Sequence, residues 1–108
     1  TAAGLEILTR DGRWLAVEAP PGHIVVDSGD MMQLLTNGTL PATTHRVVNP
    51  PTSADDLPRY SMPFFVHPYP SCPLAPLPFC VSDDAPAKYE ATTAQGYLEK
   101  RLRELGLL

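Results

Sequence analysis

The sequence predicts a mainly β fold that ends in one amphipathic helix, and three observations support this prediction. Short β-branched and aromatic runs, separated by glycine and proline turns, are typical of strands. Proline accounts for 13 of the 108 residues, and most of the prolines lie between Pro50 and Pro78, which excludes long helices from the middle of the chain. A 3.6-residue period of apolar side chains begins only near Thr92.

The N-terminal quarter of the chain predicts three strands. Leu5–Leu8 and Trp14–Val17 are separated by the turn sequence of residues 10–12, so we expect them to form a hairpin. The Pro-Pro-Gly turn at residues 20–22 precedes residues 23–27, whose β-branched run is typical of a buried strand.

The next stretch predicts one helical turn and two further strands. Residues 31–35 follow a potential capping residue and stop at Asn37-Gly38, which is typical of a short helix with a left-handed end. Residues 43–48 are predicted as a fourth strand. Residues 59–67 are predicted as a fifth, with a bulge or an edge position at Pro63.

The chain is short enough for one domain at most, and its composition divides it into three regions. Residues 1–67 are predicted as a β core, residues 68–91 as a proline-rich irregular arm, and residues 92–108 as the amphipathic helix. The apolar positions of that helix recur at helical spacing and are Tyr97, Leu98, Leu102 and Leu105.

Charge and hydropathy argue against several functions. The formal net charge is −4 and no basic stripe is present, so we expect no nucleic-acid partner and no membrane partner. The apolar runs are far shorter than the ~20 residues that a spanning helix needs. The N-terminus has no secretory signal pattern, and Cys72 and Cys80 fit two free thiols in a reducing compartment, so we expect a cytoplasmic location.

Three histidines are the first candidates for chemistry: His23, His45 and His67. The sequence contains no His-x-His, His-x-Asp or Cys-x-x-Cys spacing, so no local metal motif can be recognised. Spacing alone therefore leaves a structural role open for each of them.

A second candidate is the Arg-x-Ser pair of Arg59 and Ser61. Strand alternation places both on one face, where a guanidinium and a hydroxyl together suit a carboxylate. By the same rule His45 shares a face with Thr43 and Val47. If both faces line one interior, an imidazole and a carboxylate clamp share a pocket; a surface arginine and a structural histidine are the alternative.

A series of short motifs follows in unbroken order: Gly4-Leu5-Glu6-Ile7, Asp11-Gly12-Arg13-Trp14, Pro21-Gly22, Val25-Val26, Gly29-Asp30-Met31, Leu35-Thr36-Asn37-Gly38, His45-Arg46-Val47-Val48-Asn49 and Arg59-Tyr60-Ser61-Met62-Pro63-Phe64-Phe65. This order resembles the C-terminal half of the iron(II)/2-oxoglutarate oxygenases of the isopenicillin N synthase-like group. The resemblance covers about residues 4–67.

The resemblance implies a fold, a function and two cofactors. The fold is a double-stranded β-helix, a jelly-roll or cupin-like barrel, of which residues 1–67 would be the C-terminal part. The cofactors are Fe(II), held by a His-x-Asp pair and a distant histidine, and the co-substrate 2-oxoglutarate. His45 matches the distant histidine, and Arg59 and Ser61 match the pair that binds the far carboxylate of 2-oxoglutarate. The implied enzyme is a dioxygenase that couples 2-oxoglutarate decarboxylation to oxidation of a small-molecule substrate.

Two departures from the family pattern matter. No His-x-Asp pair occurs in these 108 residues, so one of three iron ligands is expected here, and the chain alone is expected to be inactive without the N-terminal half of the same protein as its partner. Asp27 stands where members often carry asparagine.

Two other interpretations stay open at this point. One is a non-catalytic β-sandwich binding or structural module derived from the same fold, in which Arg59 and Ser61 hold at most a small carboxylate. The other is a cupin-like metal enzyme in which His23 or His67 binds the metal. The prime substrate, the choice between hydroxylation, desaturation and cyclisation, and the oligomeric state cannot be deduced from these residues.

Overall fold

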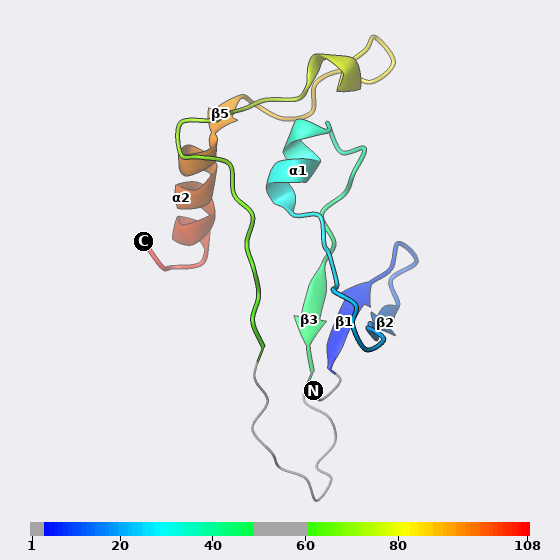
Figure 1. Cartoon of the computed structure of the whole chain (residues 1–108). Coiled ribbons are helices and arrows are strands. Elements are labelled where there is room, and N and C mark those ends of the chain that lie inside the picture. The colour runs from blue at the N-terminus through cyan, green and yellow to red at the C-terminus, as the bar shows by residue number, and fades with distance from the viewer. Residues whose placement is uncertain (1–3, 49–60) are drawn as a thin grey trace, which may run out of the picture. The chain divides into compact units, whose positions relative to one another are not determined.

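A computed structural model describes residues 4–48 and 61–108 of the chain (Figure 1). The chain divides into two compact units. Of the described residues, the first contains 4–27, 43–48 and 61–64, and the second contains 28–42 and 65–108. Within the described residues, no helix is long and apolar enough to cross a membrane.

The first unit is built on a three-stranded antiparallel sheet. Its strands are β1 (Leu5–Leu8), β2 (Trp14–Ala16) and β3 (His45–Val47), in the order β2-β1-β3 (Figure 1). The predicted hairpin is confirmed, and the predicted fourth strand is confirmed over its central residues.

The hairpin forms because its turn satisfies its own backbone. The amide of Thr9 donates to the carbonyl of Arg13 at 2.8 Å, and the amide of Gly12 donates back to the carbonyl of Thr9 at 3.0 Å. Gly12 adopts a φ of +81°, a left-handed conformation that glycine takes without a steric penalty. These turn bonds are consistent with the observed register, in which Leu8 pairs with Trp14.

The register of β3 against β1 assigns side chains to two faces of the sheet. Ile7 lies opposite His45, and Glu6 lies opposite Arg46. Since successive side chains alternate, His45 shares a face with apolar residues, and Arg46 projects from the other face. The members of the His45 face are Leu5, Ile7, Leu15, His45 and Val47.

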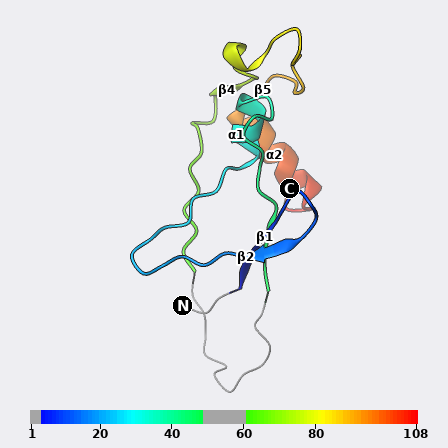
Figure 2. The same ribbon diagram turned by 90° about the vertical axis from the view of Figure 1, so that its right-hand side faces the viewer.

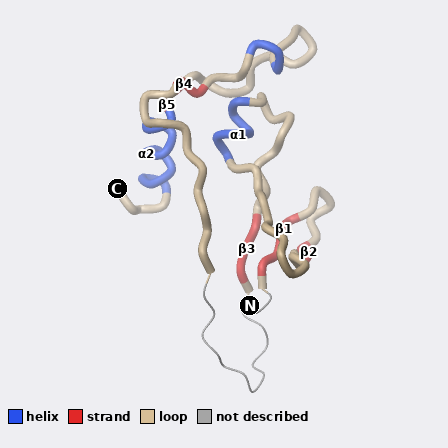
Figure 3. Tube along the Cα trace, viewed as in Figure 1, coloured by secondary structure: helices blue, strands red, loops and turns tan. Residues whose placement is uncertain are grey.

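Two predicted strands are not strands in the described structure (Figure 3). Residues 23–27 are irregular, with Ile24 88% and Val26 90% exposed. Residues 61–67 are also irregular, and the rest of that prediction, Arg59 and Tyr60, lies outside the described residues. A β-branched run needs a neighbouring strand to complete its hydrogen bonds, and within the described residues neither segment has one.

The second unit combines helices with a small two-stranded sheet. It contains α1 (Asp30–Leu35), β4 (Pro73–Leu74), the 3₁₀ turn η1 (Pro78–Cys80), β5 (Thr92–Thr93) and α2 (Ala94–Glu104). β4 pairs antiparallel with β5, and α1 lies beside α2 in both views (Figures 1 and 2).

The core of this unit comes from three separate segments. Leu34 of α1, Leu74 of β4 and Ala94 of α2 are buried together, and Leu74 is fully inaccessible. Leu74 belongs to the proline-rich segment 68–91, which was expected to be irregular. Prolines exclude a long helix from this segment, yet they leave short extended pieces that can bury an apolar side chain.

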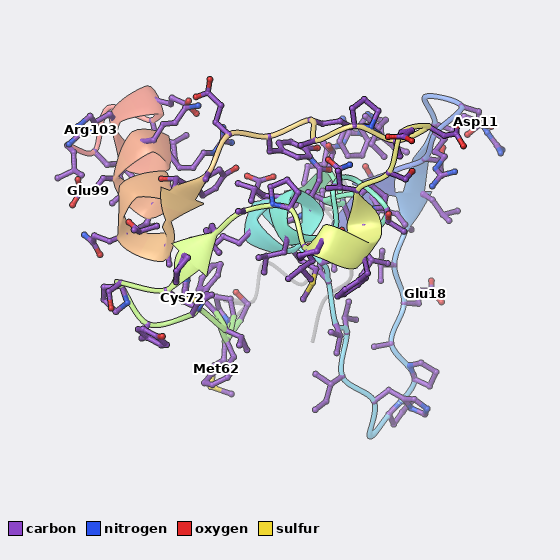
Figure 4. The ribbon with its side chains drawn as sticks, turned by 90° about the horizontal axis from the view of Figure 1, so that it is seen from above. Asp11, Glu18, Met62, Cys72, Glu99 and Arg103 are labelled. Carbon is purple, nitrogen blue, oxygen red and sulfur yellow. The ribbon has the colours of Figure 1, made fainter. Side chains whose placement is uncertain are left out.

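The predicted C-terminal helix is confirmed as α2, and its sequence contains its own start signal. The Thr93 hydroxyl accepts a hydrogen bond from the amide of Gly96 at 3.1 Å, which caps the first turn. Along the exposed side, Arg103 pairs with Glu99 at 3.2 Å, one turn apart (Figure 4).

Asn37 ties the end of α1 to η1 and to the chain that follows η1. It is 3% exposed and adopts a left-handed φ of 53°. Its side-chain amide donates to the carbonyls of Cys80, Ala85 and Pro86 at 3.1–3.3 Å, while its oxygen accepts from the amide of Lys88 at 2.8 Å. One side chain therefore satisfies four backbone groups of a segment with little regular structure.

Candidate metal ligand and its surroundings

The candidate metal ligand His45 is the first residue of β3. Its cross-strand partner is Ile7, and its neighbours on the same face are apolar. The ring is half-exposed, with 55% of its side-chain surface accessible. A histidine on a mostly apolar sheet face has few polar groups to satisfy it, which makes the few groups near its ring informative.

Two oxygen atoms face the Nδ1 atom of His45. The carbonyl oxygen of Thr43 lies 3.0 Å from Nδ1, and the Oδ2 atom of Asp27 lies 3.3 Å from it. A carbonyl and a carboxylate can only accept hydrogen bonds, so this environment favours a proton on Nδ1. The neutral ring then presents the lone pair of Nε2, the atom that can bind a metal ion.

The opposite face of the sheet has a different chemistry. Arg46 lies 2.8 Å from Glu6 through its guanidinium, and it also stacks over the ring of Trp14, with 3.9 Å from Cζ to the ring centroid. The guanidinium is thus already engaged by a carboxylate and an aromatic ring. We assign Arg46 a structural role that holds β3 against the hairpin.

The predicted carboxylate clamp is only partly described. Ser61 is exposed and lies in an irregular segment, and Arg59 lies outside the described residues. The assignment of both residues to 2-oxoglutarate stays a prediction, as does the assignment of His45 to iron.

The other two histidines have separate surroundings. His23 is exposed, with its Nδ1 atom 3.3 Å from the carbonyl of Pro21. His67 belongs to the second unit, where its ring centroid lies 6.0 Å from that of Phe65. Residues 4–48 and 61–108 contain no group of three or more His, Cys, Asp or Glu side chains that could hold a metal ion.

These observations test the fit of an iron ion. A neutral imidazole with a free Nε2 atom fits one ligand position, and His45 offers it. The described residues do not supply a complete ligand set. Sequence reasoning missed the contact of Asp27 with His45, because the two residues are far apart in the chain and Asp27 lies in no regular element.

Comparison with known proteins places the chain in a family. Residues 1–68 match the 2OG-Fe(II) oxygenase superfamily, and the chain belongs to this family. Among curated proteins, flavanone 3-dioxygenase 2 of Oryza sativa subsp. japonica is 39% identical over 99 residues, which cover 91% of this chain and 27% of the relative. Gibberellin 3-beta-dioxygenase 1 of the same plant is 35% identical and is matched over 95% of this chain and 26% of its own length.

Solved structures agree with this assignment. A 2OG-Fe(II) oxygenase family protein from Caulobacter crescentus is 48% identical, with a TM-score of 0.88 over 95% of this chain and 34% of that protein. A Neurospora crassa protein solved in complex with alpha-KG is 30% identical, with a TM-score of 0.85 over 95% of this chain and 32% of that protein. The chain therefore spans about a quarter to a third of the proteins it matches.

The resemblance drawn from the motifs is thus confirmed at the level of the family. Fe(II) and 2-oxoglutarate, the expected cofactors, are the two that the family's description names. The coarse fold class is also confirmed, because the described residues form short strands and a C-terminal helix, and the similar solved structures are oxygenases of this family.

Proposed function

We propose that this chain is the C-terminal part of an Fe(II)- and 2-oxoglutarate-dependent dioxygenase. The observation that carries the proposal is the setting of His45, whose Nδ1 atom faces the Thr43 carbonyl and the Asp27 carboxylate and whose Nε2 atom is left for a metal. Strands β1, β2 and β3 would belong to a double-stranded β-helix in the full-length protein. The remaining iron ligands would come from residues outside these 108, which contain no His-x-Asp sequence.

Each predicted site residue has one role in this proposal. His45 binds iron through Nε2, Arg59 binds the far carboxylate of 2-oxoglutarate in bidentate fashion, and Ser61 donates a further hydrogen bond to that carboxylate. The bound Fe(II) supplies the redox chemistry that couples oxidation of 2-oxoglutarate to oxidation of the substrate. The contribution of this chain is to hold the metal and orient the co-substrate.

The proposed substrate is a small organic molecule. The names of the relatives include flavanone, scopoletin and gibberellin enzymes, and the Neurospora crassa protein was also solved with thymine. These compounds differ widely in shape, and the proposal therefore names a small organic molecule and no particular compound. A cytoplasmic location belongs to the same proposal, supported by two free cysteines, Cys72 and Cys80.

The experiment uses the full-length protein that carries this chain. Fe(II) and 2-oxoglutarate are added without oxygen, and the charge-transfer absorption of the chelated co-substrate is titrated. We expect the band in the wild type, no band in His45→Ala, and an unchanged band in the matched control His23→Ala.

A second variant separates the two cofactors. Arg59→Ala should bind Fe(II) like the wild type but need a much higher 2-oxoglutarate concentration for the same band, because the guanidinium contact is lost. A wild-type affinity for 2-oxoglutarate in Arg59→Ala would refute the clamp. A full band in His45→Ala would refute the proposed metal ligand.

A further inference from the structure

We propose that Asp27 is a positioning residue for His45. Its carboxylate, together with the carbonyl of Thr43, keeps the proton of the neutral imidazole on Nδ1 and fixes the direction of the ring, so that Nε2 is presented to the metal. This inference rests on the proposed function, because it assigns a purpose to Asp27 only if His45 binds iron.

The geometry around Nδ1 carries the inference. Nδ1 lies 3.0 Å from the Thr43 carbonyl oxygen and 3.3 Å from Oδ2 of Asp27. An unprotonated Nδ1 would turn its lone pair toward two oxygen acceptors, which is electrostatically unfavourable. A protonated Nδ1 is attracted to both. The Thr43 carbonyl accepts the proton of Nδ1, and the negative charge of Asp27 beside it favours the same tautomer of the ring.

The two acceptors come from different parts of the chain. Thr43 lies two residues before His45 and leads directly into β3, so its carbonyl constrains the ring locally. Asp27 lies in the irregular segment between β2 and α1, and its Oδ2 atom lies 3.3 Å from Nδ1 of His45. A ring with two contacts at Nδ1 loses more rotational freedom than a ring with one.

A purely structural role explains the Asp27 contact poorly. The two side chains are 55% and 39% exposed, and exposed contacts with a charged side chain contribute little to stability. Carboxylates that hold the second nitrogen of a metal-binding histidine commonly change metal affinity by about 10- to 100-fold when they are removed. We therefore expect Asp27 to affect the metal site far more than the stability of the fold.

The first test reads the tautomer directly. Imidazole ¹⁵N shifts of His45 are measured in the full-length, metal-free protein labelled at histidine. We expect the Nδ1-protonated tautomer in the wild type and in Asp27→Asn, whose amide oxygen can still face Nδ1. Asp27→Ala should give a mixture with the Nε2-protonated form. A wild-type ring protonated on Nε2 would overturn the proposal without any variant.

The second test measures Fe(II) binding without oxygen. Asp27→Ala should weaken the affinity about tenfold, whereas Glu18→Ala, which removes another exposed carboxylate of the same unit, should not change it (Figure 4). The melting temperatures of both variants should match that of the wild type. If Asp27→Ala fails to fold, Asp27→Leu carries the same prediction, because it keeps the size of the side chain and removes the acceptor.

The outcomes separate this inference from the proposed function. If His45→Ala loses Fe(II) binding while folded Asp27→Ala keeps the wild-type affinity and tautomer, the positioning role is wrong and the proposed function stands. If His45→Ala binds Fe(II) like the wild type, the proposed metal ligand fails first.

Discussion

The adjacent residues His45 and Arg46 of β3 project from opposite faces of the sheet. His45 turns its ring to the face that carries Ile7 and Leu15, whereas Arg46 turns to the other face and contacts Glu6 and Trp14. Strand alternation alone predicts this division, because successive side chains lie on opposite faces. The contact of Asp27 with His45 follows from no such rule, since it depends on the course of an irregular segment.

Asn37 gives a prediction at the same scale. Asn37→Asp removes the amide that donates to the carbonyls of Cys80, Ala85 and Pro86 and places a carboxylate oxygen against them. We expect a loss of about 3 kcal/mol or more in the free energy of unfolding, since buried acceptors lose their donor and gain a repelling charge. Chemical denaturation measures it.

The matched control keeps the backbone and removes only the side-chain bonds. Asn37→Gly accepts the left-handed φ of 53° without strain, so it should lose less stability than Asn37→Asp. Equal stability of Asn37→Asp and the wild type would show that the four backbone contacts do not hold this segment. From the sequence, Asn37 was recognised only as a helix stop, because its hydrogen-bond partners are remote in the chain.

At the scale of the element, the sequence predicts those helices and strands whose signals lie close together in the chain. The hairpin and α2 were predicted because turn residues, capping residues and apolar periods lie within a few positions of each other. The strands expected over 23–27 and 59–67 depended on neighbours that no local pattern specifies, and the described parts of both segments are irregular. The burial of Leu74 was unpredicted for the same reason.

The cap of α2 yields an element-scale prediction. Thr93→Ala removes the hydroxyl that accepts from the amide of Gly96, and we expect about 1 kcal/mol of lost stability. Thr93→Ser keeps the hydroxyl and should behave like the wild type in the same thermal unfolding experiment. If Thr93→Ser and Thr93→Ala lose the same stability, the loss does not come from the hydroxyl contact.

The contact between α1 and α2 predicts a pH dependence. Partial burial raises the pKa of the Tyr97 phenol above 10.0, and the negative charge of Asp30 raises it further, while Arg101 opposes the shift. Because the folded pKa is higher than the unfolded value, the stabilising contribution is complete below about pH 10 and is lost as the pH rises through the folded pKa.

The measurement compares the pH dependence of the unfolding free energy in the wild type and in Tyr97→Phe. Other groups also titrate at alkaline pH, so the difference in unfolding free energy between the wild type and Tyr97→Phe is followed. The wild type should lose stability relative to Tyr97→Phe as the pH rises above about 10. A difference that does not change with pH would contradict the shift.

At the scale of the whole molecule, the described chain has much exposed apolar surface. Met62 is 97% exposed, Phe64 is 89% exposed, and Ile24 and Val26 are similarly open. Side chains of these types are usually buried in a complete protein. This agrees with a chain that spans only 27% of the length of a relative such as flavanone 3-dioxygenase 2. In the proposed enzyme, the remaining length covers these side chains and supplies the rest of the iron site.

The family could be recognised from the sequence because its motifs keep their order along the chain, and the match of residues 1–68 confirms it. The complete site could not be predicted in the same way. His45 is one imidazole, and a metal site is a convergence of several residues in space, which a linear pattern describes only when all of them are within it.

The most direct test of the account is a crystal structure of the full-length protein with Fe(II) and 2-oxoglutarate, grown without oxygen. We expect Nε2 of His45 on the metal, Nδ1 facing Asp27 and Thr43, and the Arg59 guanidinium on the far carboxylate of 2-oxoglutarate. A metal ion bound without His45, or a co-substrate carboxylate held by residues other than Arg59, would contradict it.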